Sequence, residues 1–233
     1  MEKYYCSVSV SPIRTEVSEQ SEMSSQILYG ETCEIIETEG LYSKIKMDFD
    51  EVEGWVNSSV LKKNVETSKN VISQTFGLFD LPEGRSLLSI GSEVSFAAEN
   101  FVDTNNLRES LVETAKKFLN VPFLWGGRSF FGIDDSGFVQ LLYKVHGITL
   151  PRDPEQQALQ GTARDFVEES EAGDLAFFED AEGNINHVGL VLSPFEIIHV
   201  SGKVRIDSLD FSGIYNAEQN KHTHKLRFVK TLL

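Results

Sequence analysis

Cysteine is scarce in this sequence, with two residues, Cys6 and Cys33, among 233. Both lie in strand-like surroundings near the N-terminus, and two cysteines are too few for the disulfide framework of a small secreted domain. The sequence therefore predicts two buried free thiols, because unpaired cysteine behaves as a small hydrophobic residue. Neither cysteine lies near the motifs described below, which argues against both as candidate nucleophiles.

Long hydrophobic runs are also missing. No stretch approaches the ~20 apolar residues that a membrane-spanning helix needs. Residues 1–6 lack the basic start and the apolar run of a signal peptide. These absences predict a chain without a membrane span and a cytoplasmic location, or a periplasmic or secreted one if a signal has been removed.

Basic residues are few compared with acidic ones. There are 21 lysines and arginines against 36 aspartates and glutamates, which gives a formal net charge of −15. An acidic surface repels nucleic acid and anionic membranes, so neither is an expected partner. The hydrophobic fraction of 40% is ordinary for a globular protein with a substantial core.

Short alternating segments dominate the first part of the chain. Residues 5–10 alternate between apolar and polar side chains, residues 41–47 follow a strict period of two, and residues 54–56 close the pattern after an acidic turn. Several short strands within about sixty residues predict a small antiparallel barrel over residues 1–64.

The pattern weakens over residues 65–103. Residues 65–70 are predicted to be a linker, whereas residues 76–79 and 89–96 have the composition of strands. Two interpretations remain open for this region, a shortened second barrel or an ordered connector.

Helical periodicity begins at residue 105. One helix is predicted up to residue 120, where Pro122 ends it, and a second over residues 136–146, where Gly147 ends it. Strands follow at residues 176–178, 187–192, 197–200 and 204–206. Helices followed by an antiparallel sheet predict an α+β domain over residues 104–233.

The second helix opens at the most informative position, Asp135. A loop-to-helix turn with two strand histidines downstream, here His187 and His199, is the layout of a papain-like thiol hydrolase. The partial positive charge of a helix N-terminus activates a thiol placed there, and the histidines supply a base and its orienting partner. The thiol itself is absent, because position 135 holds aspartate.

Six motifs in this order resemble those of the NlpC-type peptidoglycan endopeptidases. They are Trp125-Gly126-Gly127, the Gly132–Gln140 segment with Asp135 at its variable position, Leu150-Pro151-Arg152-Asp153, Gly173-Asp174-Leu175, Asn186-His187-Val188-Gly189 and Ile198-His199-Val200-Ser201-Gly202. The first part of the chain resembles the bacterial SH3-type modules that accompany such enzymes. That resemblance rests on Gly30-Glu31, the strand around Ile45-Lys46 and Glu53-Gly54-Trp55-Val56.

This resemblance implies a papain-like fold and a cysteine peptidase that cleaves the bond between D-γ-glutamate and the diamino acid of cell-wall stem peptides. The implied partners are recycling peptides of the form L-Ala-γ-D-Glu-diamino acid. By the same resemblance, His187 is the general base and His199 its orienting partner. The implied pocket for the peptide amine is lined by Asp134, Ser136, Arg152 and Asp153, with Trp125 as a wall.

The sequence departs from this family at two places. The nucleophilic cysteine is replaced by Asp135, and Val52 stands near the place where related proteins often carry a tyrosine that closes the pocket. An aspartate at a helix start is well placed as a structural residue, but its carboxylate is a weak nucleophile towards an amide.

The leading interpretation is therefore a peptidoglycan-peptide hydrolase scaffold that binds its peptides and cleaves them poorly or not at all, without a cofactor or a metal. The rival interpretation is a non-catalytic protein that binds or senses these peptides. A metal site built from Asp135, His187 and His199 is a further alternative, because two histidines and one carboxylate can hold a transition metal.

Overall fold

A computed structural model describes residues 2–63, 70–97 and 102–233. Residues 65–69 of the predicted linker lie outside these ranges. The chain divides into two compact units. Unit 1 comprises Met1–Phe101 and Leu124–Ile133, and unit 2 comprises Val102–Phe123 and Asp134–Leu233. Within the described ranges, no helix combines the length and the apolar character that crossing a membrane requires.

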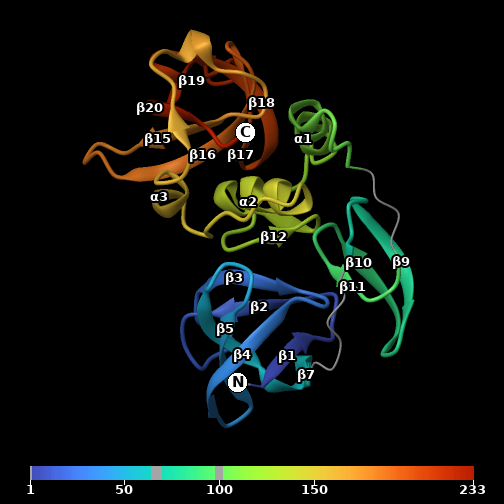
Figure 1. Cartoon of the computed structure of the whole chain (residues 1–233). Helices are drawn as coiled ribbons and strands as arrows, with labels where there is room; N and C mark the ends of the chain where they lie inside the picture. The colour runs from blue at the N-terminus through green and yellow to red at the C-terminus, as the bar shows by residue number, and fades with distance from the viewer. Residues whose placement is uncertain (1, 64–69, 98–101) are drawn as a thin grey trace. The chain divides into compact units, whose positions relative to one another are not determined.

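Unit 1 contains a seven-stranded antiparallel sheet in the order β3-β2-β6-β5-β4-β1-β7 (Figure 1). Its strands are β1 (Lys3–Cys6), β2 (Val10–Arg14), β3 (Met23–Leu28), β4 (Thr32–Glu39), β5 (Tyr42–Met47), β6 (Glu53–Asn57) and β7 (Leu61–Lys63), with a 3-10 turn, η1 (Ser58–Val60), before the last. Strands β1 to β6 each place side chains in one apolar cluster, so the sheet curls around a single core. The cluster consists of Cys6, Ile13, Ile27, Cys33, Ile45, Met47 and Val56.

The period-two pattern identified β5 correctly, since alternate residues of this strand are buried. The two cysteines are free and buried, as predicted. The single strand predicted over residues 5–10 is wrong, because β1 ends at Cys6 and β2 begins only at Val10. A bend intervenes at residues 8–9, and the Ser7 amide donates to the carbonyl of Val60 instead of continuing a ladder.

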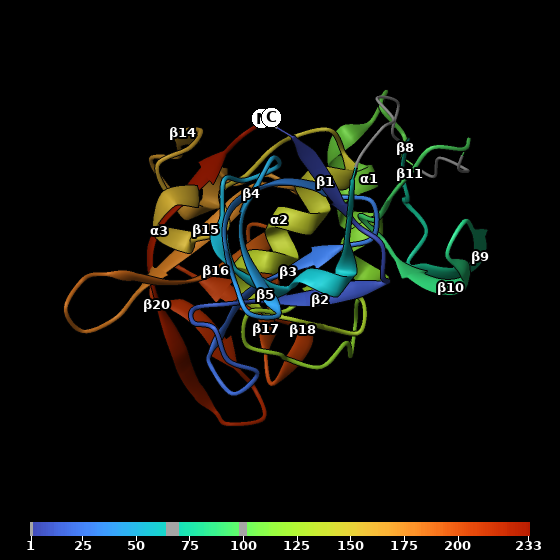
Figure 2. The same cartoon turned by 90° about the horizontal axis from the view of Figure 1, so that it is seen from below.

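The region after this sheet forms two separate ribbons. Strand β8 (Asn70–Val71) pairs with β11 (Glu93–Val94), and β9 (Phe76–Leu81) pairs with β10 (Gly84–Ser89). The continuous strand predicted over residues 89–96 is wrong, because Gly91 adopts a φ of 86° and turns the chain between β10 and β11. The β9–β10 ribbon stands beside the seven-stranded sheet in Figures 1 and 2. A small cluster of Tyr29, Ile72, Leu88 and Val94 forms the core of this region.

The segment Leu124–Ile133 also belongs to unit 1, and it carries a hairpin of β12 (Arg128–Ser129) and β13 (Gly132–Ile133). The guanidinium of Arg128 forms two hydrogen bonds with the carboxylate of Glu31, one of them 2.9 Å long, and both side chains are fully buried. The backbone amide of Arg128 donates to the side chain of Gln26 at 2.8 Å. These contacts anchor the segment within unit 1.

Unit 2 contains a second sheet in the order β14-β20-β15-β16-β17-β18-β19. Its strands are β14 (Thr162–Ala163), β15 (Leu175–Glu179), β16 (Ile185–Ser193), β17 (Glu196–Ser201), β18 (Lys203–Asp210), β19 (Gly213–Asn216) and β20 (Lys221–Thr231). An additional pairing of β19 with β20 closes six of these strands into a ring. The strands predicted from sequence correspond to β15–β18, whereas β14, β19 and β20 were not predicted.

The helices of unit 2 are α1 (Leu107–Lys116), α2 (Asp135–Val145) and α3 (Pro154–Gln157), with a 3-10 turn, η2 (Val167–Glu169). Helix α2 packs against α1 and against strands β16 and β17 (Figure 1). Every residue of α2 after the first is buried, because an apolar helix between a sheet and another helix has little surface left for water. Helices α1 and α2, which correspond to the two predicted helices, and the antiparallel sheet that follows them confirm the α+β prediction.

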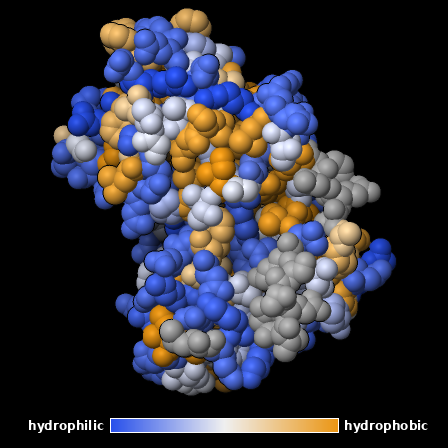
Figure 3. Space-filling view, in the orientation of Figure 1, coloured by the Kyte–Doolittle hydropathy of each residue, from blue (hydrophilic) through white to orange (hydrophobic). Residues whose placement is uncertain are grey.

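Both polar and large apolar residues occur on the surface of the chain. Hydrophilic residues cover most of unit 1 on the face drawn in Figure 3. Unit 2 exposes several large apolar side chains, among them Phe195 and Phe211.

Candidate active site

The candidate site lies at one end of the closed sheet in unit 2. Side chains alternate between the two faces of a strand, so residues two or four apart share a face. Three buried pairs on one face each join a core residue with a polar one: Val191 with His187, Ile197 with His199, and Leu209 with Asp207. The apolar core of the ring therefore continues directly into a polar cluster.

Helix α2 places Asp135 opposite this cluster. Asp134 is the N-cap, and its side chain accepts a hydrogen bond from the Gly137 amide at 2.8 Å. Asp135 is the first helical residue, as the sequence predicted. Its Oδ2 lies 2.7 Å from Nδ1 of His187 and accepts a second hydrogen bond, from the Val188 amide at 3.1 Å.

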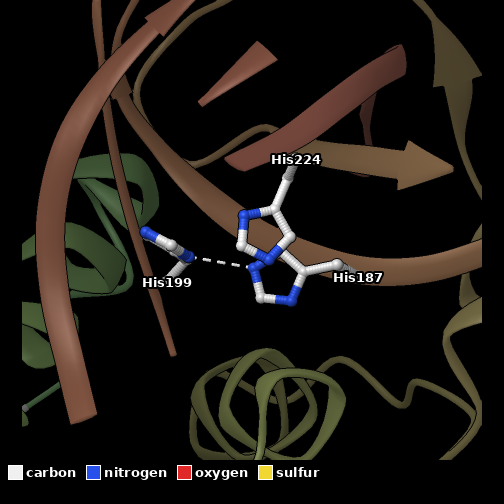
Figure 4. Close-up of side chains that lie close together, drawn as sticks. All are labelled: His187, His199 and His224. Carbon is white, nitrogen blue, oxygen red and sulfur yellow. Dashed lines mark hydrogen bonds between the residues drawn. The ribbon is translucent and has the colours of Figure 1, made fainter. Parts of the chain in front are cut away.

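A chain of hydrogen bonds runs from Asp135 into the sheet. Nε2 of His187 lies 2.9 Å from Nδ1 of His199, and Nε2 of His199 lies 3.0 Å from Oδ2 of Asp207 (Figure 4 shows the histidines). The exposed fraction falls from 17% for the Asp135 side chain to 7% for His187 and 1% for His199, and it is 5% for Asp207. The predicted proximity of Asp135, His187 and His199 is thereby confirmed, whereas their chemical roles stay predictions.

The surroundings keep both carboxylates of this chain ionised. Burial alone would raise the pKa of Asp135, but the charge and the hydrogen bond of His187 outweigh burial and lower it. Burial likewise opposes ionisation of Asp207, yet hydrogen bonds from His199 and Arg205 lower the pKa of this carboxyl group. Burial lowers the pKa of His199 despite its bond to Asp207.

The residues predicted to line the pocket are partly assembled beside Asp135. Arg152 is buried, and its guanidinium donates to Oδ2 of Asp134 at 2.5 Å and to Oγ of Ser136 at 2.6 Å. Burial raises the pKa of Asp134, and the Arg152 charge opposes this rise. Asp153 is exposed and caps α3 by accepting a hydrogen bond from the Glu155 amide at 2.8 Å. Binding of substrate by these four residues stays a prediction.

Trp125 lies in unit 1, and its role as a pocket wall stays a prediction. Its indole N–H donates to Oε1 of Glu22 at 2.7 Å, and 62% of the residue is exposed. Close contacts with other backbone atoms of unit 1 explain why the two positions beside Trp125 are glycines. A Cβ on Gly126, whose φ is 71°, would lie 2.2 Å from the carbonyl oxygen of Met23, and one on Gly127 would lie 2.6 Å from that of Gly132.

Two members of the cluster were missed by the sequence analysis, Asp207 and His224. Arg205 holds Asp207 through two hydrogen bonds of 2.6 and 2.9 Å. The ring of His224, on β20, stacks on His187 with a centroid distance of 4.1 Å and an interplanar angle of 23°. Burial, together with the charges of His187 and His199, lowers the pKa of His224 to about 3. The alternating pattern of residues 221–231 was the available signal for β20.

The alternative metal site of Asp135, His187 and His199 does not fit this geometry. Asp135 contacts Nδ1 of His187, whereas His199 contacts Nε2, on the other side of the same ring. One ion bound by a single nitrogen of His187 cannot reach both partners. The ring nitrogens that do converge are those of His187, His199 and His224, one from each lying within 4.8 Å of the others.

Two known families match the chain. The NlpC/P60 family matches residues 120–225, and the family described as the bacterial dipeptidyl-peptidase Sh3 domain matches residues 13–61. The first match spans the whole hydrogen-bonded chain from Asp135 to Asp207. The second spans β3 to β6 and the last two residues of β2, Ile13 and Arg14.

The curated relatives include two enzymes named gamma-D-glutamyl-L-lysine dipeptidyl-peptidase. The one from Bacillus cereus is 34% identical over 154 residues, covering 62% of this chain and 46% of the relative. The one from Bacillus subtilis is 41% identical over 93 residues, covering 39% of this chain and 31% of the relative. The chain thus spans less than half the length of these two relatives.

The fold agrees with solved structures of the same kind. A crystal structure of an NlpC/P60 family protein from Bacillus cereus superposes with a TM-score of 0.83 at 20% identity and covers 98% of this chain and 99% of that one. The predicted papain-like α+β fold is thereby confirmed. These matches establish that the chain carries an NlpC/P60 domain together with a bacterial SH3-type domain.

Proposed function

We propose that this chain binds peptidoglycan stem peptides of the form L-Ala-γ-D-Glu-diamino acid on the scaffold of a γ-D-glutamyl-L-diamino acid endopeptidase, and that it does not cleave them at a measurable rate. The observation that carries the proposal is the 2.7 Å contact between Asp135 Oδ2 and His187 Nδ1. A protein with these properties serves as a binding or sensing protein for muropeptides.

The relatives support the class of ligand. Two of them are named for the γ-D-glutamyl-L-lysine bond. The match to the NlpC/P60 family covers residues 120–225, which include the candidate site. The geometry supports the proposed roles of His187 as a base and His199 as its orienting partner, since one imidazole nitrogen of His187 faces Asp135 and the other contacts His199.

The state of Asp135 supports the absence of turnover. In a thiol hydrolase the histidine takes the proton of the nucleophile as the nucleophile attacks. The lowered pKa of Asp135 means that this group has already lost its proton, so His187 has none to remove. Oδ2 of Asp135, the oxygen that faces His187, also accepts hydrogen bonds from His187 and from the Val188 amide. A carboxylate stabilised in this way is a weak nucleophile towards an amide carbonyl.

We propose that the residues that bind the peptide keep a geometry suitable for binding. Asp134, Ser136 and Arg152 hold one another through short hydrogen bonds, so their positions are set before a ligand arrives. Replacement of the nucleophile by aspartate leaves this network unbroken. The acidic side chains beside the site, with the net charge of −15, favour a ligand that carries a free amine.

Calorimetry and product analysis on the unmodified protein test this function. Titration with L-Ala-γ-D-Glu-diaminopimelate and with L-Ala-γ-D-Glu-L-lysine in chelator-treated buffer is expected to give saturable binding. Chromatography of the same mixtures after prolonged incubation is expected to give no free diamino acid. N-acetylated versions of both peptides are the matched control, and weaker binding is expected because the acetyl group removes the amine charge.

Two results would overturn the proposal. Release of diamino acid by the unmodified protein would mean that Asp135 supports turnover. Absence of binding to either peptide would remove the assignment of the ligand.

A further inference from the structure

His224 is the part of the cluster that the peptide chemistry does not use. We propose that His187, His199 and His224 form a binding site for a divalent transition-metal ion such as Zn²⁺, and that Asp135 acts there as the hydrogen-bond partner that orients His187. The inference is independent of the proposed function, because it requires no peptide.

The three rings converge on one point from three strands. The centroid of the His199 ring lies 5.1 Å from that of His187 and 5.6 Å from that of His224. One ring nitrogen from each histidine lies within 4.8 Å of the other two (Figure 4). His187 and His199 are buried and His224 is half-buried, so the point of convergence is shielded from most of the solvent. Imidazole nitrogens in such a set suit zinc, copper, nickel and iron rather than calcium or magnesium.

The outward nitrogen of each ring is held by an oxygen atom. Nδ1 of His187 contacts the Asp135 carboxylate at 2.7 Å, and Nε2 of His199 contacts the Asp207 carboxylate at 3.0 Å. Nδ1 of His224 lies 2.9 Å from Oγ1 of Thr223. Histidines that bind metals nearly always use their second nitrogen in this way, because a bound oxygen fixes the tautomer and turns the free lone pair towards the ion.

In this arrangement the carboxylate of Asp135 is the hydrogen-bond partner of the metal ligand His187. An ionised carboxylate that accepts the N–H of a metal-bound imidazole raises the basicity of that ligand. Asp207 plays the same part for His199, and Arg205 keeps this second carboxylate in place. Two of the three ligands therefore have a charged partner behind them.

Binding requires two adjustments of the rings. Ligand nitrogens around tetrahedral zinc lie about 3.3 Å apart, given Zn–N distances of about 2.0–2.1 Å. The 2.9 Å contact between Nε2 of His187 and Nδ1 of His199 must therefore open slightly, as the ion replaces the hydrogen that joins them. The His224 ring must tilt out of its stack on His187, so that its free nitrogen points at the ion. Three protein ligands leave one coordination position for a water molecule.

Histidine-ring NMR on the unmodified chain tests the site directly. After chelator treatment, one equivalent of Zn²⁺ is expected to shift the ring resonances of His187, His199 and His224. The rings of His146 and His222 are expected to stay unchanged and serve as internal controls. Shifts confined to His222, which lies on the surface beside Asp210, would reveal adventitious binding and overturn the proposal.

Calorimetry on two variants supplies the second measurement. His224→Phe keeps an aromatic ring against His187 but removes a ligand, and His222→Phe is the matched control on the same strand. Zn²⁺ affinity is expected to fall in His224→Phe by more than the roughly 10–100-fold typical for loss of an outer hydrogen-bond partner, and to be unchanged in His222→Phe. Asp207→Asn is expected to lose about 10–100-fold. Equal affinity in the unmodified protein and His224→Phe, or no binding of one ion per chain, would contradict the proposal.

Discussion

The buried ion pair of unit 1, Arg128–Glu31, and the pair in the candidate site of unit 2, His187–Asp135, differ in whether their charges can be given up. Arg128 and Glu31 have no exposed side-chain surface, and a guanidinium keeps its proton at any pH that a protein survives. The Asp135 side chain is 17% exposed, and its partner is a histidine, a residue type that exists in charged and neutral forms.

This difference separates a structural pair from one suited to chemistry. The Glu31 charge raises the pKa of Arg128 further although burial opposes it, so the pair is fixed and anchors the segment Leu124–Ile133. The pair in unit 2 stands at the more exposed end of a hydrogen-bonded chain of side chains that continues through His199 to Asp207. The same type of contact thus anchors a segment in one unit and belongs to the hydrogen-bonded candidate site in the other.

Removal of one partner from the fixed pair is expected to have the largest effect on stability. Glu31→Gln leaves a buried guanidinium without its counter-charge, which typically lowers the free energy of unfolding by about 3–5 kcal/mol. Urea denaturation of the variant measures this loss. Glu34→Gln is the matched control, because Glu34 pairs with Lys3 at the surface, where such pairs contribute about 0–1 kcal/mol. Similar losses in the two variants would refute the anchoring role of Arg128.

Removal of the carboxylate from the titratable pair is expected to have a smaller effect. Asp135→Asn keeps the shape of the side chain but loses a hydrogen bond to a charged group, which is worth about 1.5–3 kcal/mol. The asparagine carbonyl can still accept a hydrogen bond from His187, whereas Glu31→Gln leaves a guanidinium that keeps its charge. If Asp135→Asn lowered the free energy of unfolding at pH 7 by more than Glu31→Gln does, the proposed difference between the two pairs would be contradicted.

The pH dependence of this second loss has a definite sign. The pKa of Asp135 is lower in the folded chain than in the unfolded one, so its stabilising contribution is present above the unfolded value of ~3.9 and is lost as the pH falls through the folded value. The difference between the unmodified protein and Asp135→Asn is therefore expected to shrink at acidic pH. A difference that grows on acidification would mean that Asp135 is not ionised at neutral pH.

The smallest expected effect belongs to His146, a buried histidine outside the candidate site. Its ring nitrogens contact the carbonyl of Leu142 at 2.7 Å and Oγ of Ser110 at 3.0 Å, and burial lowers its pKa. The unfolded chain therefore binds a proton more readily, and stability is expected to decline as the pH falls below the unfolded value of ~6.5. His146→Gln should have a flatter dependence on pH than the unmodified protein between pH 7.5 and 5. An unchanged slope would show that His146 does not contribute.

The sequence predicted the parts of this site that depend on local pattern. The start of α2 at Asp135 followed from the change to helical periodicity, and the two strand histidines followed from their motifs. Asp207 and His224 were missed because their place depends on strand pairing. Asp207 reaches His199 across the β17–β18 pairing, and His224 arrives on β20, which closes the ring through β19 and β15.

Long-range contacts also explain two features of the structure that the sequence did not predict. The Trp125-Gly126-Gly127 motif predicts a close approach of backbone to some group, but the group that fills the space is the carbonyl of Met23, about one hundred residues earlier in the chain. The affiliation of Leu124–Ile133 with unit 1 depends on the Arg128–Glu31 pair, which no local pattern reveals. Hydrophobic periodicity and sequence motifs predict individual helices and strands, whereas the pairing register between strands determines which side chains contact one another.

The central claim is that the scaffold lacks only its nucleophile, and Asp135→Cys tests it most directly. The partial positive charge at the start of α2 favours a thiolate as it favours a carboxylate, and His187 is in place to take the thiol proton. Loss of a nucleophile typically removes a factor on the order of 10⁶ in rate. Release of diamino acid from L-Ala-γ-D-Glu-diaminopimelate is the measurement, with Asp135→Ala as the matched control. We expect release by the cysteine variant alone, and its complete block by iodoacetamide. Equal release by the unmodified protein and Asp135→Cys, or none by Asp135→Cys although the peptide binds, would contradict the account.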